Sequence, residues 1–329
     1  MAAALLLVLA PAVCLLAALA FLARPRATRI PLKGRHVFIT GGSSGIGLAI
    51  ATAAAREGAR VSILARDAAR LEEARAAIQR GSGRHDDTVV GVHAADVRDA
   101  GAVARALREA GPVDVLVCNH GVFMSHELEK QDMGEIERMV DTNLTGTIRL
   151  VKAALPAMKA RARETRLPAS IAIMSSQAGQ VGVYGYAAYS ATKFALRGLG
   201  EALQHEVAMG NIYISLIFPP DTETPGLQKE LKTRQELTSI IAGSSGGMKA
   251  DDVATKALDG IKSGKFIVPC NFEGALLALG TAGLSLQSSP IMAFVEVTAA
   301  GLMRFLALCF QWSWFCTIES YYAKNKKRE

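Results

Sequence analysis

The chain has 329 residues, of which 50% are hydrophobic and 20% charged, which excludes a disordered or fibrous protein and makes membrane contact an expectation. The net charge of +7 is scattered, and only 6% of the residues are aromatic, which argues against a nucleic-acid partner. The five cysteines form no CxxC pair and the six histidines no metal-binding pattern, which excludes a disulfide framework and the usual zinc spacings and favours a reducing compartment.

The first 23 residues contain no charged side chain. At about 1.5 Å per residue they are long enough to cross a hydrocarbon core of about 30 Å. Residues 24–33 form a basic linker, and the positive-inside rule places the chain after it in the cytosol. We interpret residues 1–23 as an uncleaved transmembrane anchor. A cleaved signal peptide is the alternative, but its positive charge would precede the apolar run.

Strand-like and helix-like segments alternate between residues 34 and 270. Runs rich in β-branched residues predict strands at 36–40, 60–64, 88–93, 113–118, 171–174 and 213–218. The alternation predicts an α/β fold, a Rossmann-like doubly wound parallel sheet with its ligand site at the carboxyl ends of the strands. The polar segment 221–249 is expected to form a mobile excursion over that site.

A turn of small residues follows the first predicted strand and opens the next helix. Backbone amides in such a turn can approach a pyrophosphate at the positive end of the helix, so the turn predicts a dinucleotide site. The candidate cofactor contacts in this turn are Gly41, Ser43, Ser44, Gly45, Ile46 and Gly47.

The residues after the second strand indicate which dinucleotide binds. A carboxylate there would hold the ribose hydroxyls of NAD, whereas a cation accepts the 2′-phosphate of NADP. Arg66 follows the strand and Arg70 lies one helical turn further on, so NADPH is favoured. Asp67 is the competing carboxylate, and we expect it to cap the helix at 68–79. Further candidate contacts, each of which also suits an ordinary turn, are Asp96 for the adenine edge and Asn119 and Gly121 for the nicotinamide side.

Tyr189 and Lys193 are four residues apart and share one face of a predicted helix. A free tyrosine has a pKa of about 10. A nearby ammonium and an oxidised nicotinamide would favour the phenolate, so that Tyr189 becomes a usable proton donor to a carbonyl under reduction. Ser176, at the end of a strand, can hydrogen-bond the developing oxyanion, and Asn143 can complete a water-mediated proton path through Lys193. A surface lysine, a core tyrosine and turn serines are the competing interpretation.

The C-terminal residues 271–329 are expected to be membrane-associated. Residues 274–286 are apolar but short, which suits a buried, re-entrant or interfacial segment. Residues 291–315 are long enough to cross, but they contain Glu296 and Arg304, and a central arginine costs about 2.5–3.5 kcal/mol on insertion scales. An interfacial belt is predicted at Trp312, Trp314, Tyr321 and Tyr322.

The chain ends in Lys326-Lys327-Arg328-Glu329, which resembles the dilysine signal that returns membrane proteins to the endoplasmic reticulum. Because such signals act on cytosolic tails, the resemblance and the N-terminal anchor together imply zero or two crossings at this end. A solvated charge cluster at the terminus is the alternative.

The glycine turn, Asn119-x-Gly121, Asn143, Ser176 and Tyr189-x-x-x-Lys193 together resemble the short-chain dehydrogenase/reductases over residues 34–270. The resemblance implies that Tyr189 is the catalytic acid, that Lys193 lowers its pKa and binds the nicotinamide ribose, and that Ser176 orients the carbonyl. It also implies that Asn143 supports the relay. Two departures are His120, where the family usually has alanine, and the serine pair, which makes Ser175 a minor candidate for the orienting role.

Four further segments, 175–180, 194–199, 201–204 and 219–226, resemble the branch of that family that reduces a long-chain sphingoid ketone with NADPH. That resemblance implies a site on the cytosolic face of the endoplasmic reticulum membrane, with the sphingoid ketone and membrane lipid as partners. It adds Pro219 and Thr222 to the cofactor contacts. The alternatives are a steroid or retinoid oxidoreductase of the same family and a non-catalytic dinucleotide-binding scaffold. Homo-oligomerisation is left open.

Overall fold

The computed structural model describes residues 2–23, 28–84, 89–243 and 246–326. It divides into two compact units: Arg29–Gly274, and the two chain ends, Met1–Thr28 with Ala275–Glu329. Part of the predicted basic linker, residues 24–27, lies outside the described residues, as does most of the dilysine-like tail, residues 327–329.

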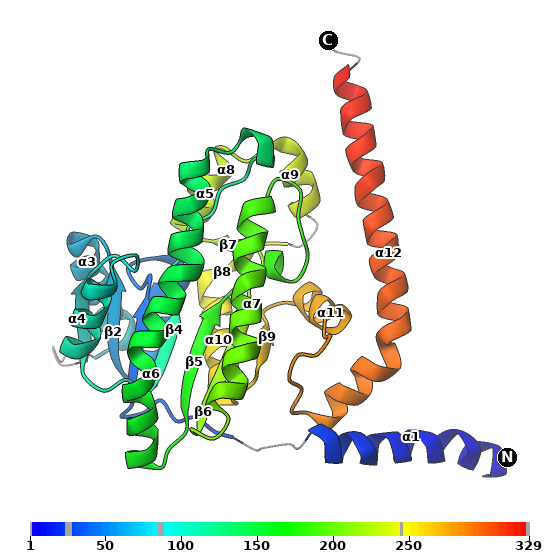
Figure 1. Ribbon diagram of the computed structural model, residues 1–329, viewed down its shortest axis with the longest axis horizontal. Helices are drawn as coiled ribbons and strands as arrows, with labels where there is room; N and C mark the ends of the chain where they lie inside the picture. The colour runs from blue at the N-terminus through cyan, green and yellow to red at the C-terminus, as the bar shows by residue number, and fades with distance from the viewer. Residues whose placement is uncertain (1, 24–27, 85–88, 244–245, 327–329) are drawn as a thin grey trace. The chain divides into compact units, whose positions relative to one another are not determined.

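The centre of the unit Arg29–Gly274 is a seven-stranded parallel sheet (Figure 1). Its order is β3-β2-β1-β4-β5-β6-β9, so the direction of winding reverses between β1 and β4. In doubly wound sheets ligands bind outside the carboxyl ends of the strands at such a reversal. The strands are β1 (His36–Thr40), β2 (Arg60–Ala65), β3 (Val90–Ala94), β4 (Val115–Cys118), β5 (Ala169–Met174), β6 (Ile212–Phe218) and β9 (Ile267–Pro269).

The predicted doubly wound α/β fold is therefore confirmed. Each of the six predicted strands overlaps an observed one, and their ends differ by at most two residues. The prediction missed β9, which has 3 residues and pairs with β6 at the edge of the sheet.

Helices cover both faces of the sheet, and each face has its own hydrophobic cluster. The first cluster packs α2 (Gly45–Arg56), α3 (Ala68–Ser82) and α10 (Ala250–Lys262) on one face. The second packs α4 (Ala100–Ala110), α6 (Gly146–Thr165) and α7 (Ala187–Val207) on the other.

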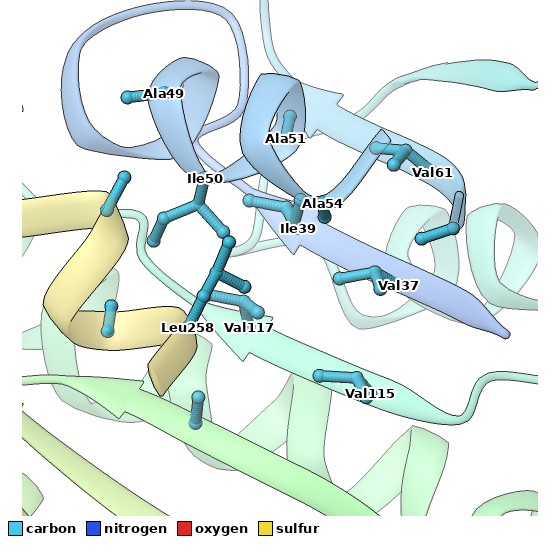
Figure 2. Close-up of a cluster of buried hydrophobic side chains, with 14 of the residues drawn as sticks. Val37, Ile39, Ala49, Ile50, Ala51, Ala54, Val61, Val115, Val117 and Leu258 are labelled. Atoms are coloured by element: carbon cyan, nitrogen blue, oxygen red, sulfur yellow. The ribbon is translucent and has the colours of Figure 1, made fainter. Parts of the chain in front are cut away.

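The cluster beneath α2 shows why that helix lies so close to the sheet. Its inward face carries small residues such as Ala51 and Ala54, both fully buried, which allow the helix to approach the strands. Figure 2 shows Ile50 of α2 and Leu258 of α10 pointing toward one another near Val117 of β4. Burying an aliphatic side chain of this size contributes about 1.5–3 kcal/mol, so this packing holds α2 against the sheet.

The polar segment 221–249 has internal structure that the sequence analysis did not predict. It contains α8 (Pro225–Leu231) and α9 (Glu236–Ala242), and the short strands β7 (Thr222–Glu223) and β8 (Met248–Lys249) pair with each other near its two ends.

Earlier in the chain, α5 (Met133–Val140) continues into a π-helical turn (η2, Asp141–Thr145) and then into α6. Such π-turns occur often at functional sites.

The chain ends contain two long helices, α1 (Ala2–Ala23) and α12 (Pro290–Lys326), and α11 (Phe272–Gly280) precedes α12. Among the described residues, one helix is long and apolar enough to cross a membrane, Pro290–Asn325. It runs through Glu296 and Arg304 without a break. The anchor role of residues 1–23 and the number of crossings at the C-terminal end stay predictions.

Candidate active site

The glycine turn between β1 and α2 is shaped by two positive φ angles and one close approach. Gly41 and Gly45 have φ of +66° and +55°, which glycine adopts without strain. A Cβ atom on Gly47 would lie 2.2 Å from the Gly41 carbonyl oxygen, so only glycine fits there. Asn119 closes the turn from the end of β4, since its Nδ2 donates to the Thr40 oxygen at 3.2 Å. The turn and the end of β4 therefore form one rigid edge.

This turn fits the pyrophosphate of a dinucleotide. The first amides of an α-helix have no partner within the helix, and they favour an anion at its positive end. Ser44 at the N-cap of α2 makes no side-chain hydrogen bond to these amides. The predicted contacts Gly41, Ser43, Ser44, Gly45, Ile46 and Gly47 all lie in this turn or in the first residues of α2.

The residues after β2 and β3 carry the charges that the sequence analysis singled out. Arg66 and Arg70 are exposed. Asp67 caps α3 by accepting a hydrogen bond from the Arg70 backbone at 3.2 Å, as predicted. Asp96 is ion-paired with Arg98 at 2.7 Å, and these hydrogen bonds hold the pKa of its carboxyl below the usual range. An adenine contact through Asp96 would have to share the carboxylate with Arg98.

The catalytic candidates Ser176, Tyr189 and Lys193 come together at the carboxyl end of β5 and the start of α7. Ser176 lies close enough to the Tyr189 hydroxyl to lower its pKa. The Lys193 ammonium is 5.6 Å from the centre of the Tyr189 ring and donates to the Met174 carbonyl at 2.9 Å. The side chains that the Tyr-x-x-x-Lys spacing placed on one helix face are therefore neighbours in space.

The acidity of Tyr189 differs from the sequence expectation. Burial raises its pKa above the ordinary value, the nearby Ser176 side chain opposes this rise, and the charges of Asp221 and Glu230 add to it. Burial lowers the pKa of Lys193 to about 8. Acidification of the phenol by Lys193 thus stays a prediction for the complex with an oxidised nicotinamide, whose positive charge would act in the same direction.

The two adjacent serines have different partners. The Ser175 hydroxyl is buried and donates to the Lys193 carbonyl oxygen at 2.9 Å, so it holds α7 against the end of β5. Ser176 caps a short 3-10 turn, accepts from the Ala178 amide at 3.2 Å and reaches Tyr189. Of the two candidates, Ser176 is the one beside the phenol.

Asn143 lies in the π-helical turn and is fully buried. Its side chain accepts from the Val122 amide and donates to the Val122 carbonyl, both at 2.8 Å, and it donates to Thr192 at 3.1 Å. A Cβ atom on Gly121 would lie 3.8 Å from the Lys193 ammonium. Asn143 therefore fixes the loop after β4 beside Lys193, and its part in a proton relay stays a prediction.

His120, the departure from the family pattern, bridges two elements. Its Nδ1 lies 2.7 Å from the Thr40 hydroxyl and its Nε2 lies 3.3 Å from the Thr147 hydroxyl. Burial lowers the pKa of the imidazole to about 4, so the neutral ring joins β1 to α6 near pH 7. The larger side chain at this position thus links Thr40 and Thr147 by polar contacts beside the glycine turn.

The end of β6 supplies the last predicted contacts. The Pro219 carbonyl accepts from the Gln177 amide at 3.1 Å, which ties β6 to the turn after β5. The Thr222 side chain is buried and donates to the Pro220 carbonyl at 2.9 Å. Thr224, which the sequence analysis did not select, contacts the glycine turn, since its Cγ2 is 2.8 Å from where a Gly45 Cβ would lie.

An aromatic pair beside Tyr189 was also missed. The rings of Phe123 and Tyr186 lie 5.8 and 5.6 Å from the Tyr189 ring. The Tyr186 hydroxyl donates to Glu230 of α8 at 2.9 Å, and Arg234 binds the same carboxylate. The contacts of Phe123, Glu230 and Arg234 join residues far apart in the chain, so no local pattern predicts them. The sequence signal for this group is the position of Tyr186 three residues before Tyr189.

A family model for short chain dehydrogenases matches residues 35–235. Since this match covers more than half of the chain, the protein belongs to the short-chain dehydrogenase family, as its motifs predicted. Among similar solved structures are a 3-ketoacyl-(acyl-carrier-protein) reductase from Brucella melitensis complexed with NADH, and a short-chain dehydrogenase from Sphingobium yanoikuyae in complex with NADPH. The first is 26% identical with a TM-score of 0.64, covering 72% of this chain and 97% of the other. The second is 27% identical with a TM-score of 0.61, covering 72% and 88%.

More similar relatives carry a narrower name. A 3-dehydrosphinganine reductase of Arabidopsis thaliana is 56% identical over 315 residues, which cover 96% of this chain and 93% of the relative. A 3-ketodihydrosphingosine reductase of Bos taurus is 35% identical over 285 residues, which cover 85% and 84%. The predicted resemblance to the branch that reduces sphingoid ketones is therefore confirmed, and the roles of individual site residues stay predictions.

Proposed function

We propose that this protein reduces 3-dehydrosphinganine to sphinganine with NADPH, as a step of sphingolipid synthesis at the endoplasmic reticulum membrane with its catalytic unit facing the cytosol. The observation that carries the proposal is the convergence of Ser176, Tyr189 and the buried Lys193 at the carboxyl end of β5. It lies at the sheet edge that also carries the glycine turn, in a chain 56% identical to named reductases.

The protein's own side chains account for the proton transfer to the carbonyl oxygen. NADPH, when bound, supplies the hydride that the ketone carbon receives. Ser176 donates a hydrogen bond to the carbonyl oxygen, and Tyr189 gives that oxygen its proton. With a pKa of about 8, Lys193 is largely protonated at neutral pH, and its ammonium stabilises the phenolate that Tyr189 becomes when it gives up its proton.

The choice of NADPH rests on charge after β2. Arg66 and Arg70 are exposed there, and Asp67 caps α3 and also ion-pairs with the Arg70 side chain at 3.5 Å. Two cations with the nearest carboxylate engaged favour a ligand that carries a 2′-phosphate. The adenosine end would thus be held by Arg66 and Arg70, the pyrophosphate by the glycine turn, and the nicotinamide ribose by Tyr189 and Lys193.

Turnover of the full-length protein in membranes tests the proposal. With NADPH, we expect oxidation of the cofactor and formation of sphinganine from 3-dehydrosphinganine, and no comparable rate with a ketosteroid or retinal. Reduction of the steroid or retinal in preference to the sphingoid ketone would assign the protein to the alternative substrate class.

Tyr189→Phe separates catalysis from binding. Removing one hydroxyl leaves the ring packed against Phe123 and Tyr186, so NADPH binding should persist while turnover falls about 10²–10⁴-fold, the usual contribution of a general acid. Tyr184→Phe, which removes a hydroxyl bonded to Glu127 instead, is the matched control. Undiminished turnover in Tyr189→Phe contradicts the assigned role.

A further inference from the structure

Three charged side chains form a cluster beside the candidate catalytic tyrosine, and we call Asp221, Glu230 and Arg234 the charged cluster. Arg234 Nη1 donates to Asp221 Oδ2 at 2.6 Å, and Arg234 Nε donates to the two Glu230 oxygens at 3.0 and 2.7 Å. Two carboxylates share one guanidinium, so the cluster carries one negative charge in excess. A site with such an excess favours a positively charged ligand group.

The charged cluster lies within reach of the reacting groups. The Arg234 guanidinium is 5.7 Å from the centre of the Tyr186 ring, and that ring is 5.6 Å from the ring of Tyr189. Asp221 follows the end of β6 by three residues, and β6 is bonded at that end to Ser175 through the Ile217 carbonyl at 2.9 Å. The charges of both carboxylates act on the Tyr189 hydroxyl and raise its pKa.

The two carboxylates differ in what they still can bind. The Glu230 side chain is 3% exposed, and its oxygens accept from the Tyr186 hydroxyl and from Arg234. The Asp221 side chain is 36% exposed, and its hydrogen bond to Arg234 uses only Oδ2. Among the described residues of the cluster, Asp221 is thus the carboxylate with an oxygen left for a further donor.

The substrate named by the relatives has a matching group. In 3-dehydrosphinganine an amine sits on the carbon next to the ketone, so its protonated form places an ammonium within two bonds of the reacting carbon. An ammonium taken from water into a protein site needs a carboxylate partner. We propose that Asp221 is this partner and selects ketones that carry a neighbouring ammonium over ketones that lack it. The inference rests on the proposed function and adds a specificity-determining residue to it.

The test compares two ketones and three proteins. The ketones are 3-dehydrosphinganine and the same 1-hydroxy-3-ketone with hydrogen in place of the amine. The proteins are full-length wild type, Asp221→Asn, and Glu223→Gln, which neutralises an exposed carboxylate two residues away. Asp221→Asn should lower kcat/KM for the amino ketone about 10- to 100-fold, as expected for a lost charge-assisted hydrogen bond, and leave the amine-free ketone nearly unchanged. Glu223→Gln should change neither value.

A second measurement does not depend on the folding of a variant. The wild-type protein should itself favour the amino ketone over the amine-free ketone by about the same 10- to 100-fold factor. Equal use of both ketones by wild type, or equal losses on both in Asp221→Asn, overturns the role of Asp221 and leaves the proposed reduction standing. Reduction of neither ketone by wild type overturns the proposed function and this inference together.

Discussion

Removing the guanidinium of the charged cluster should unfold the catalytic unit at a lower temperature. Arg234 is 3% exposed and binds both Glu230, also 3% exposed, and Asp221. In Arg234→Met the similar volume is kept, but the buried Glu230 carboxylate loses its positive partner. Breaking a buried ion pair from one side costs about 3–5 kcal/mol.

That cost converts into a measurable shift in Tm. For a unit of this size, about 2–4 °C is lost per kcal/mol, so Arg234→Met should lower Tm by about 6–20 °C. The assay is thermal unfolding of the full-length protein in detergent, measured by differential scanning calorimetry. Arg138→Met, on the exposed face of α5, is the matched control and should stay within about 2 °C of wild type.

A double variant isolates the cause. In Glu230→Gln combined with Arg234→Met, the buried negative charge is gone, so a substantial part of the lost Tm should return. If the single variant Arg234→Met melts with the control, or if the double variant melts below the single one, the unpaired carboxylate is not what destabilises the protein.

Three further outcomes follow from the site. The kcat/KM of wild type should fall as pH rises through about 8, because Lys193 then loses its proton while the raised pKa of Tyr189 keeps the phenol protonated. In Lys193→Arg the positive charge persists, so the fall in kcat/KM above about pH 8 should be absent. A wild-type kcat/KM that stays level to pH 10 would contradict this prediction. Replacing both Arg66 and Arg70 with Glu should raise the KM for NADPH at least about tenfold and spare that for NADH, as measured by initial rates; parallel changes would refute the charge argument. Gly47→Ala should abolish dinucleotide binding in a fluorescence titration, because its Cβ would lie 2.2 Å from the Gly41 oxygen, and wild-type affinity would show that the turn can move aside.

Local sequence patterns predicted most of the sheet because its strands are short runs of β-branched residues bounded by turns. They missed β9, since three residues carry no period and only pairing with β6 makes them a strand. The helices α8 and α9 have 7 residues each, too few to show an apolar period.

The candidate site was likewise predicted only in part from the sequence. Spacing alone brought Tyr189 and Lys193 together, because a helix fixes which residues share a face. It did not predict the raised pKa of Tyr189, which depends on burial and on carboxylates that are distant in the chain. Nor did it predict the bridge made by His120 between Thr40 and Thr147, since the partners are brought together by the tertiary fold.

The serine pair after β5 shows that the identity of the serine beside Tyr189 depends on the register of the strand. Neighbouring residues of an extended chain face opposite ways, so one hydroxyl supports the backbone of α7 and the next meets the phenol. Deleting a single residue within β5 would therefore move Ser176 to the place of Ser175 and bring Gln177 to the place beside the phenol. Both serines would still be present in the chain, yet the reacting position would carry a glutamine amide in place of a hydroxyl.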